Sequence, residues 1–537
     1  MRIKRPALIL PLRAWLPLAA VLFALALGGC GPAAQTQAAV LNLLITVDGQ
    51  QLTAQVPTGT TVQAALEEAG VALGSLDRIE PPGFSVLTEP AAIKVTRVRE
   101  EFEVREVVVP FEEQRVRNEL LPKDEVRRVQ EGSPGLTQDT YRHLYEDGVL
   151  VSTTLFQSVV VTEARPEIIM VGVQLPVTPT PLAGRLVYLT AGNAWIMEET
   201  TGDRRPLVTT GDLDGYIFSL SPDGEWLLYS RKAPENDEGT INTLWAVRVT
   251  DEIPAPIDLL VNNVIHFAAW VPGENQMISY STVEPRSAAP GWQANNDLHT
   301  LAILPDGKVG KSKLLVDSNA GGVYGWWGAS FAWSPDGSRV AYARPDGVGL
   351  VNLEEGTFEP LMEILPLQTG RDWAWVPGLS WSPDGRVLYT INHGVEEGMP
   401  NPEESQHFHL TGVPVSGGPA VPVALDSGMF AYPSAARRVL ERSYRVAYIK
   451  ARFPLQSETS NYRLWLMDRD GSNQVVLFPS EDNAGLNPQQ VVWSPPAEGG
   501  KDMLAVLLEG NLYLVNAATG ESQKVTGDGS ISRIDWQ

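Results

Sequence analysis

A short motif returns several times in the C-terminal two-thirds of this chain. The clear copies read FSLSPDGEWLLYS, FAWSPDGSRVAYA and LSWSPDGRVLYTI and begin at Phe218, Phe331 and Leu379. More divergent copies begin at Phe267, Phe430 and Val491. A repeat of about 50 to 60 residues is typical of propellers and solenoid arrays, in which each repeat is one structural unit. This repeat limits the fold more than any other feature of the sequence.

The Ser-Pro-Asp-Gly core of the motif has the composition of a tight turn between two strands. Proline fixes φ at the first central position, aspartate bonds the neighbouring backbone, and glycine takes the exit conformation. We therefore interpret Asp223, Asp336 and Asp384 as turn formers and not as catalytic carboxylates. Each copy continues into further strand-like segments such as TLWAVRV and NLYLVNAATG. Four strands per unit make a propeller blade.

The blade count follows from where the units begin. Six units start with an inner strand, at roughly Tyr216, Ile265, Phe331, Leu379, Met429 and Val491. Residues 185–210 supply three outer strands without an inner strand before them, and residues 531–537 supply an inner strand with nothing after it. Joined, these fragments complete a seventh blade and close the ring, which removes both free edges. We expect a mainly β chain whose residues 185–537 form a seven-bladed propeller, with six blades as the alternative.

The N-terminus carries the signature of an export signal. Four basic residues, Arg2, Lys4, Arg5 and Arg13, precede an apolar run over residues 14–27. This run is shorter than the roughly 20 residues that a membrane-spanning helix needs, and it fits the apolar region of a signal peptide. The run ends in Leu-Gly-Gly-Cys, and Cys30 is the single cysteine of the chain.

The end of this run resembles the lipobox of bacterial lipoproteins. The resemblance implies that residues 1–29 are cleaved and that Cys30 carries the lipid. Two or more acyl chains give a stable anchor. The alternative is an ordinary cleaved signal with a coincidental cysteine. We expect a protein anchored by lipid to the cell membrane on its extracytoplasmic face, with residues 30–40 as a flexible tether.

Residues 41–97 have the pattern of a small β-grasp domain. Two alternating strands flank Asp48-Gly49, a strong hairpin signal. A helix follows, capped by Thr60 or Thr61, with Val62, Ala65, Leu66 and Ala69 on its apolar face and Gly70 at its end. The segment resembles the ubiquitin-like domains that precede G5 domains in resuscitation-promoting factors and related cell-wall proteins.

Residues 98–173 read as long alternating strands with few large apolar side chains, which predicts a thin sheet with little core. Leu121-Pro122, the segment 129–135, Tyr141 and Asp147-Gly148 occur in the order found in G5 domains. The segment is similar to that family along its whole length. The resemblance implies cell-wall association and a glycan containing N-acetylglucosamine as ligand. The alternative is a stiff spacer that lifts the rest of the chain from the membrane.

A Pro-rich linker over residues 174–184 precedes the repeats, which resemble TolB-type propellers with WD40-like repeats. Insertions cluster between the second and third strands of the units, and we expect one face of the propeller to carry the binding loops. Flat aromatic side chains suit both sugar rings and protein partners. The candidates for this face, with Tyr462 at its rim, are Trp292, Tyr324, Trp326, Trp327, Trp373, Trp375 and Tyr462. Three other tryptophans, Trp333, Trp381 and Trp493, are expected to pack between blades.

Several kinds of chemistry are disfavoured by the sequence. The formal net charge of −23 repels nucleic acid. The segment GKVGKS lacks the first glycine of a phosphate-binding loop, because position 305 is Pro305. His407 and His409 alternate and could ligate zinc, although exposed loop histidines are more common than ligands. No hydrolase nucleophile motif is present, and we expect no cofactor and no catalysis.

We therefore expect a non-catalytic surface lipoprotein that binds cell-wall glycan or peptidoglycan through its G5-like segment. The propeller would add a contact to a glycan or to a protein. One alternative is a protein-interaction scaffold in which the G5-like segment is a stalk. A further alternative is a propeller lyase or glycosidase, which would need two carboxylates about 5 to 10 Å apart in its channel.

Overall fold

The computed structural model describes residues 39–118, 121, 125–172, 179–234, 237, 239–274, 276–396, 398–439, 443–496 and 501–537. Strands dominate this part of the chain, which is mainly β as predicted. Its helices are α1 (Val62–Glu68) and two 3-10 turns, η1 (Pro402–Glu404) and η2 (Pro454–Gln456). No helix among these residues is long and apolar enough to cross a membrane. The predicted signal peptide, Cys30 and most of the tether lie outside the described residues.

Two compact units make up the chain. The first contains the described residues up to Val107 together with Thr137–Val160, and the second contains the described residues of Val108–Leu136 and Val161–Gln537. The G5-like segment is thus shared between both units instead of forming a body of its own. This division differs from the boundaries expected from the sequence, which placed one domain over residues 98–173.

The β-grasp prediction is confirmed in the first unit. The strands of this domain are β1 (Val40–Val47), β2 (Gln50–Pro57), β3 (Arg78–Glu80) and β4 (Ala92–Thr96), in the sheet order β2-β1-β4-β3. β1 and β2 pair as the expected hairpin, and β1 pairs parallel to β4. Thr61 caps α1 by accepting a hydrogen bond from the Ala64 amide at 3.3 Å. The helix buries Val62, Ala65 and Leu66 against the sheet.

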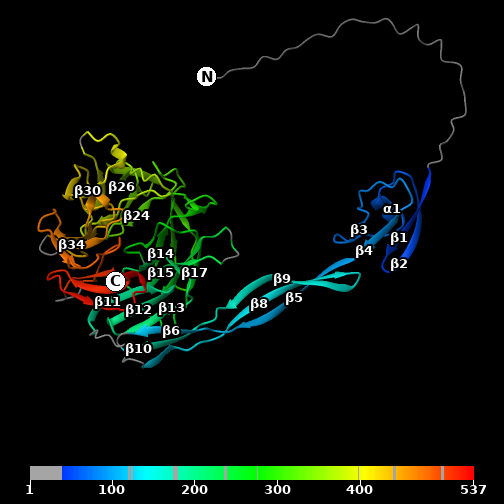
Figure 1. Ribbon diagram of the computed structural model, residues 1–537, viewed down its shortest axis with the longest axis horizontal. Helices are drawn as coiled ribbons and strands as arrows, with labels where there is room; N and C mark the ends of the chain where they lie inside the picture. Colours follow the sequence, from blue (N-terminus) through cyan, green and yellow to red (C-terminus); the bar gives the residue numbers. More distant parts are fainter. Residues whose placement is uncertain are drawn as a thin grey trace, which may run out of the picture. The chain divides into compact units, whose positions relative to one another are not determined.

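A three-stranded ribbon, drawn in blue and cyan in Figure 1, follows the β-grasp domain. Its strands are β5 (Val98–Val109), β8 (Gly135–Glu146) and β9 (Val149–Thr162), in the order β5-β8-β9. Every residue of β9 is exposed, and β8 is only partly buried. The ribbon is a single layer, as the shortage of large apolar side chains predicts.

A second sheet of the G5-like segment belongs to the same unit as the repeats. It consists of β6 (Glu113–Asn118), β7 (Val126–Gln130) and β10 (Glu167–Gly172), in the order β6-β10-β7. Ile168 and Met170 of β10 pack in one apolar cluster with Leu186, Trp195 and Trp536 of the repeat region. The expected linker therefore does not separate two independent bodies. β11 already begins at Pro181.

Seven four-stranded antiparallel sheets occupy the described residues from Pro181 to Trp536. The strands are given in sheet order. The first sheet is β13 (Arg204–Val208), β12 (Asn193–Thr200), β11 (Pro181–Thr190) and β40 (Ile531–Trp536). The second is β14 (Leu213–Leu220), β15 (Trp226–Lys232), β16 (Asn242–Arg248) and β17 (Ile257–Asn262). The third is β18 (Ala268–Trp270), β19 (Met277–Tyr280), β22 (Leu298–Ala302) and β23 (Lys313–Val316). The fourth is β24 (Ser330–Trp333), β25 (Val340–Arg344), β26 (Gly347–Asn352) and β27 (Thr357–Glu363).

The remaining three sheets follow in chain order. The fifth is β28 (Leu379–Trp381), β29 (Val387–Gly394), β30 (His407–Pro414) and β31 (Val421–Ala424). The sixth is β32 (Ser434–Ala435), β33 (Arg445–Ala451), β34 (Tyr462–Asp468) and β35 (Val475–Phe478). The seventh is β36 (Val492–Trp493), β37 (Met503–Leu508), β38 (Asn511–Asn516) and β39 (Ser522–Lys524). A two-stranded hairpin, β20 (Val283–Pro285) with β21 (Trp292–Ala294), lies in the insertion between β19 and β22.

The last strand of the chain joins the first strand of the repeat region. β40 pairs antiparallel with β11, from Trp536 opposite Leu186 to Ile531 opposite Thr190. The expected joining of residues 531–537 with residues 185–210 in one sheet is therefore found. β40 also lies beside β14 and β36, the first strands of the second and seventh sheets.

Tryptophans at the end of the first strands connect neighbouring sheets. The indole Nε1 of Trp333 donates to Ser279 Oγ at 2.6 Å, that of Trp381 to the Ala332 carbonyl at 2.9 Å, and that of Trp493 to the Ser434 carbonyl at 2.9 Å. Each partner lies in the preceding sheet. The three tryptophans predicted to pack between units do so.

The Ser-Pro-Asp-Gly segments form the expected turns. The Asp336 carboxylate accepts hydrogen bonds from Ser334 Oγ at 2.5 Å and from the Ser338 amide at 3.1 Å. The Asp384 carboxylate accepts from Ser382 Oγ at 2.6 Å. These hydrogen bonds hold the pKa of Asp336 at about 2, below its usual range. The Asp223 carboxylate accepts from Ser221 Oγ and from the Glu225 amide in the same way. All three repeat aspartates therefore stabilise turns, as predicted.

Candidate functional site

One face of the β5-β8-β9 ribbon carries a row of aromatic and charged side chains. Tyr141, His143 and Tyr145 alternate along β8 and therefore point to the same side. The Arg105 guanidinium lies over the Tyr141 ring, with its central carbon 5.0 Å from the ring centroid. Arg99 lies over Tyr145 in the same way at 4.9 Å. We call these five residues, together with Glu103, the aromatic row.

Glu103 connects the members of the aromatic row. Its carboxylate accepts two hydrogen bonds from Arg105, at 2.8 and 2.7 Å, and lies 2.9 Å from His143 Nε2. The other ring nitrogen of His143 lies 2.9 Å from Thr153 Oγ1 on β9. Hydrogen bonds from Arg105 and His143 lower the pKa of Glu103 to about 2. The row is therefore held in register across all three strands.

The opposite face of the ribbon carries an aromatic pair and an ion pair. Phe102 of β5 and Phe156 of β9 meet across β8 in an edge-to-face arrangement, with ring centroids 5.1 Å apart. Their exposed fractions are 53% and 61%. On the same face Arg142 of β8 pairs with Glu100 of β5, so that both faces of the ribbon carry aromatic and charged side chains.

Three of the aromatic residues predicted for the repeat region line one pocket. Tyr324 and Trp326 lie in the segment between β23 and β24, and Trp373 lies in the segment between β27 and β28. The pocket has a volume of about 230 Å³, and its other lining residues are Leu367, Gln368, Thr369, Gly370 and Arg371. Both segments connect the last strand of one sheet to the first strand of the next. The structure therefore brings these three predicted residues together.

Two other predicted residues, Trp292 and Trp327, pack against each other instead of lining this pocket. Their ring centroids are 5.4 Å apart, and the His266 ring lies 5.8 and 5.9 Å from them. Burial lowers the pKa of His266 to about 4, so that its ring is neutral in this cluster at neutral pH. Trp326 meets the cluster edge-on, 5.9 Å from Trp327. The cluster supports one wall of the pocket.

The structure places Trp375 and Tyr462 in the core, which corrects their assignment to the binding face. Trp375 is 1% exposed, and its indole donates to the Met429 carbonyl at 2.9 Å. Tyr462 is completely buried, and its hydroxyl donates to the Ser457 carbonyl at 2.7 Å. Each ring therefore already has its polar atom bonded inside the protein.

Three of the four ring nitrogens of the two candidate zinc ligands are engaged with other groups. His407 Nδ1 lies 2.9 Å from Asp426 and Nε2 lies 3.0 Å from Glu396, and these contacts raise the pKa of His407. His409 Nδ1 accepts a hydrogen bond from the Asp426 amide at 3.0 Å. Among the described residues, no group of three or more His, Cys, Asp or Glu side chains could hold a metal ion.

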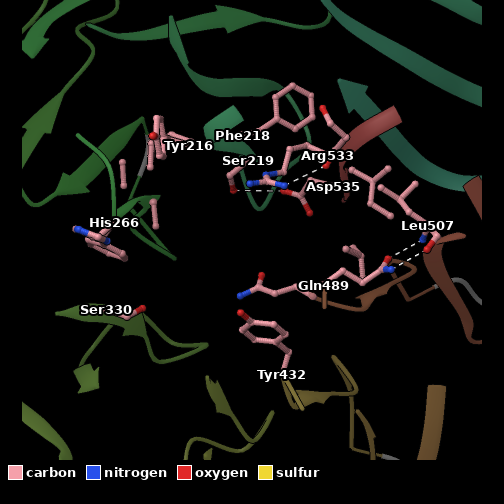
Figure 2. Close-up of a pocket in the computed structure, with 18 of the residues that line it drawn as sticks. Tyr216, Phe218, Ser219, His266, Ser330, Tyr432, Gln489, Leu507, Arg533 and Asp535 are labelled. Atoms are coloured by element: carbon pink, nitrogen blue, oxygen red, sulfur yellow. Dashed lines mark hydrogen bonds between the residues drawn. The ribbon is translucent and has the colours of Figure 1, made fainter. Parts of the chain in front are cut away.

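A larger cavity of about 690 Å³ lies between the first strands of several sheets (Figure 2). Tyr216 and Ser219 of β14, Ser330 of β24, and Arg533 and Asp535 of β40 point into it from different sides. The Asp535 carboxylate accepts a hydrogen bond from the Leu220 amide at 2.7 Å, and burial raises its pKa. Asp535 has the only acidic side chain among the described residues that line the cavity.

Sequence reasoning missed the aromatic row, although a signal for it was present. Tyr141, His143 and Tyr145 recur at every second position, which in a strand places them on one face. Their partners Arg99 and Arg105 lie about 40 residues away, and the strand register that joins them is not visible in the sequence.

Comparisons with known proteins agree on the N-terminal region. Residues 100–174 match the G5 domain family, and residues 44–83 match the G5-linked ubiquitin-like domain family. The chain therefore contains both domains predicted there, and a G5 domain suggests a role at the cell surface or cell wall. No curated protein matches the chain.

Solved structures resemble separate parts of the chain. The structure titled HP0197-G5 is 24% identical over 14% of this chain and 99% of its own, with a TM-score of 0.14. The G5 domain of IgA1 protease is 24% identical over 15% of this chain and 94% of its own, with a TM-score of 0.12. A protein from Bacteroides uniformis, named as a candidate 6-phosphogluconolactonase, is 10% identical over 65% of this chain and 98% of its own, with a TM-score of 0.39.

Proposed function

We propose that this chain is a non-catalytic cell-wall-binding protein that holds N-acetylglucosamine-containing glycan on its aromatic row. The observation that carries the proposal is the placement of Tyr141, His143 and Tyr145 in one line on a G5 domain. Successive members of the row are two strand residues apart, about 7 Å along the strand. An extended glycan laid along β8 would contact all three side chains.

The chemistry of the row suits a sugar chain. Aromatic rings accept the apolar faces of pyranose rings, while Arg and Glu side chains bond hydroxyl and acetamido groups. Arg99 and Arg105 already cover one side of their tyrosines, at 4.9 and 5.0 Å. The ligand would use the outer edges of these rings and the free donors of the guanidinium groups. Because the row is exposed, the contact is open at both ends, as binding within a long polymer requires.

The remaining parts of the proposal concern location and architecture. Cys30 would carry a lipid that anchors the protein at the extracytoplasmic face of the membrane, after removal of residues 1–29. The seven sheets would be the blades of a closed propeller. The pairing of β40 with β11 and the contacts of β40 with β14 and β36 support that reading. The propeller would then present a second ligand site.

Sedimentation of the full chain with purified insoluble peptidoglycan tests the proposal. The wild type is expected to sediment with the wall, and the double variant Tyr141→Ala/Tyr145→Ala is expected to bind about tenfold more weakly, since two rings are lost. Phe102→Ala, which removes an exposed ring from the opposite face, is the matched control and should bind like the wild type. Equal binding by the double variant and the control would contradict the proposal.

One observation favours a scaffold as a second candidate function. The edge strand β9 has 14 exposed residues and contains no charged side chain. Long uncharged edge strands pair readily with strands of other proteins. If the wall is not the ligand of the ribbon, a protein strand paired to β9 is the next candidate. The substitution Val159→Lys would then abolish partner binding and leave wall binding unchanged.

A further inference from the structure

We infer that the pocket between Tyr324, Trp326 and Trp373 binds a single uncharged pyranose ring of a glycan. This inference rests on the proposed role in wall binding, and it assigns a ligand class to a site outside the G5 domain. The pocket volume of about 230 Å³ is below the roughly 300–1,000 Å³ of pockets that enclose drug-sized ligands. One ring, such as a terminal or protruding sugar, fits that size, whereas a longer segment does not.

Backbone hydrogen bonds hold both segments that form the pocket. The Ala294 amide donates to the Trp326 carbonyl at 3.0 Å, and the Trp327 amide donates to the Tyr324 carbonyl at 3.0 Å. On the facing segment, Thr369 Oγ1 donates to the Trp373 carbonyl at 2.7 Å. A backbone that is already ordered loses little freedom on binding, which favours affinity.

Two further contacts hold the facing segment from behind. The ring nitrogens of buried His393 each lie 2.8 Å from a backbone carbonyl oxygen, one of Leu365 and one of Ser405. The backbone amide of Gln368 donates to the Glu403 carbonyl at 2.8 Å. The segment that carries Trp373 is therefore fixed to β29 and to the turn η1.

Tyr324 adopts a backbone conformation that bulky residues rarely take. Its φ is +56°, in the left-handed region that favours glycine. Strained backbone of this kind concentrates at ligand clamps. Tyr324 lines the pocket together with Trp326.

Charge argues for a neutral ligand. The single cation of the pocket, Arg371, lies 3.3 Å from the Glu458 carboxylate, and the whole chain has a net charge of −23. An anionic ligand would be repelled by the negative charge of the chain, and Arg371, the cation that could bind it, is already paired with Glu458. A neutral sugar ring needs only an aromatic face and hydrogen-bonding groups. Trp373 supplies the aromatic face, and the exposed side-chain amide of Gln368 supplies the hydrogen-bonding groups.

Intrinsic tryptophan fluorescence of the full chain, titrated with N-acetylglucosamine trisaccharide, tests the inference. The titration is run on the wild type, Trp373→Ala, Trp326→Ala and the control Phe453→Ala, whose ring is 65% exposed outside the pocket. We expect each pocket variant to bind about five- to tenfold more weakly and the control to bind like the wild type. To separate this site from the aromatic row, every titration is repeated in the Tyr141→Ala/Tyr145→Ala background.

The outcomes distinguish the two sites. Loss of binding in the pocket variants, persisting in the double-variant background, supports the pocket as a sugar site. Binding that is unchanged by Trp373→Ala and Trp326→Ala overturns the inference, even if the chain still sediments with the wall. Binding of a proline-rich peptide in place of the trisaccharide also overturns it and marks the pocket as a protein contact. Failure of wall sedimentation with intact pocket binding would contradict the proposed function alone.

Discussion

His143 Nε2 on β8 lies 2.9 Å from the Glu103 carboxylate on β5, and this contact ties the central strand of the ribbon to its edge. Glu103 also bonds Arg105, so that three residues on two strands form one polar unit. A single-layer sheet has no apolar core to hold its register. Cross-strand pairs of this kind are therefore a main source of its order.

The first prediction concerns the pH dependence of this unit. Pairing lowers the pKa of Glu103 to about 2, from its ordinary value of 4.5. The stability that the paired carboxylate contributes is fully present above pH 4.5 and is lost as the pH falls towards 2. The melting temperature of the wild type should thus exceed that of Glu103→Gln at pH 5, and the gap should close near pH 2. A gap that is unchanged at low pH would contradict this assignment.

His407 gives the opposite pH dependence. Asp426 and Glu396 raise its pKa above the ordinary value of 6.5. The stability gained from the charged ring is complete below pH 6.5 and is lost as the pH rises through the higher pKa of the folded state. The melting temperature of His407→Asn should fall furthest below that of the wild type at pH 5 to 6, and the difference should shrink towards pH 9. A difference that grows with pH would count against the ion pairs.

The pairing of the last strand, β40, with β11 predicts a large effect of Trp536. The ring is 2% exposed, and its indole donates to the Ala183 carbonyl at 2.6 Å. Replacing a buried tryptophan with alanine costs about 3–5 kcal/mol. Urea unfolding of Trp536→Ala should show a loss of that size, whereas Phe453→Ala at an exposed site should change the free energy of unfolding by less than about 0.5 kcal/mol. A loss below 1 kcal/mol would show that β40 is not essential.

The apolar cluster shared by β10 and the first repeat sheet predicts coupled unfolding. Ile168 of β10 is 1% exposed and packs in the same cluster as Leu186 and Trp195. Ile168→Ala should cost about 2–5 kcal/mol and lower the melting temperature of the repeats, although the residue belongs to the G5 segment. Ile253→Ala, at a residue 71% exposed, is the control. Destabilisation confined to the G5 strands would mean that the two parts unfold independently.

Local sequence rules predicted much of this fold. The Asp48-Gly49 hairpin, the Thr61 cap and the Ser-Pro-Asp-Gly turns depend on a few adjacent residues, and all are present. The strand fragments at residues 185–210 and 531–537 could be joined because each lacked what the other supplied.

The parts that sequence did not predict depend on distant contacts. Trp373 and Trp375 lie two residues apart, yet one lines a pocket and the other is buried against His393 and Phe408. The segment between β27 and β28 has no regular period, so nothing local indicates which ring turns inward. The packing of β10 against the repeats likewise depends on Trp195 and Trp536, which follow it by many residues.

Hydrogen–deuterium exchange of the full chain, with and without soluble N-acetylglucosamine oligomers, tests the central claim most directly. If glycan lies along the aromatic row, backbone amides in Val98–Val109 and Gly135–Glu146 should exchange more slowly when the oligomer is present. The same experiment on Tyr141→Ala/Tyr145→Ala should show no such protection. Oligomer binding that leaves exchange in both strands unchanged would contradict the claim that the G5 ribbon is the wall-binding surface.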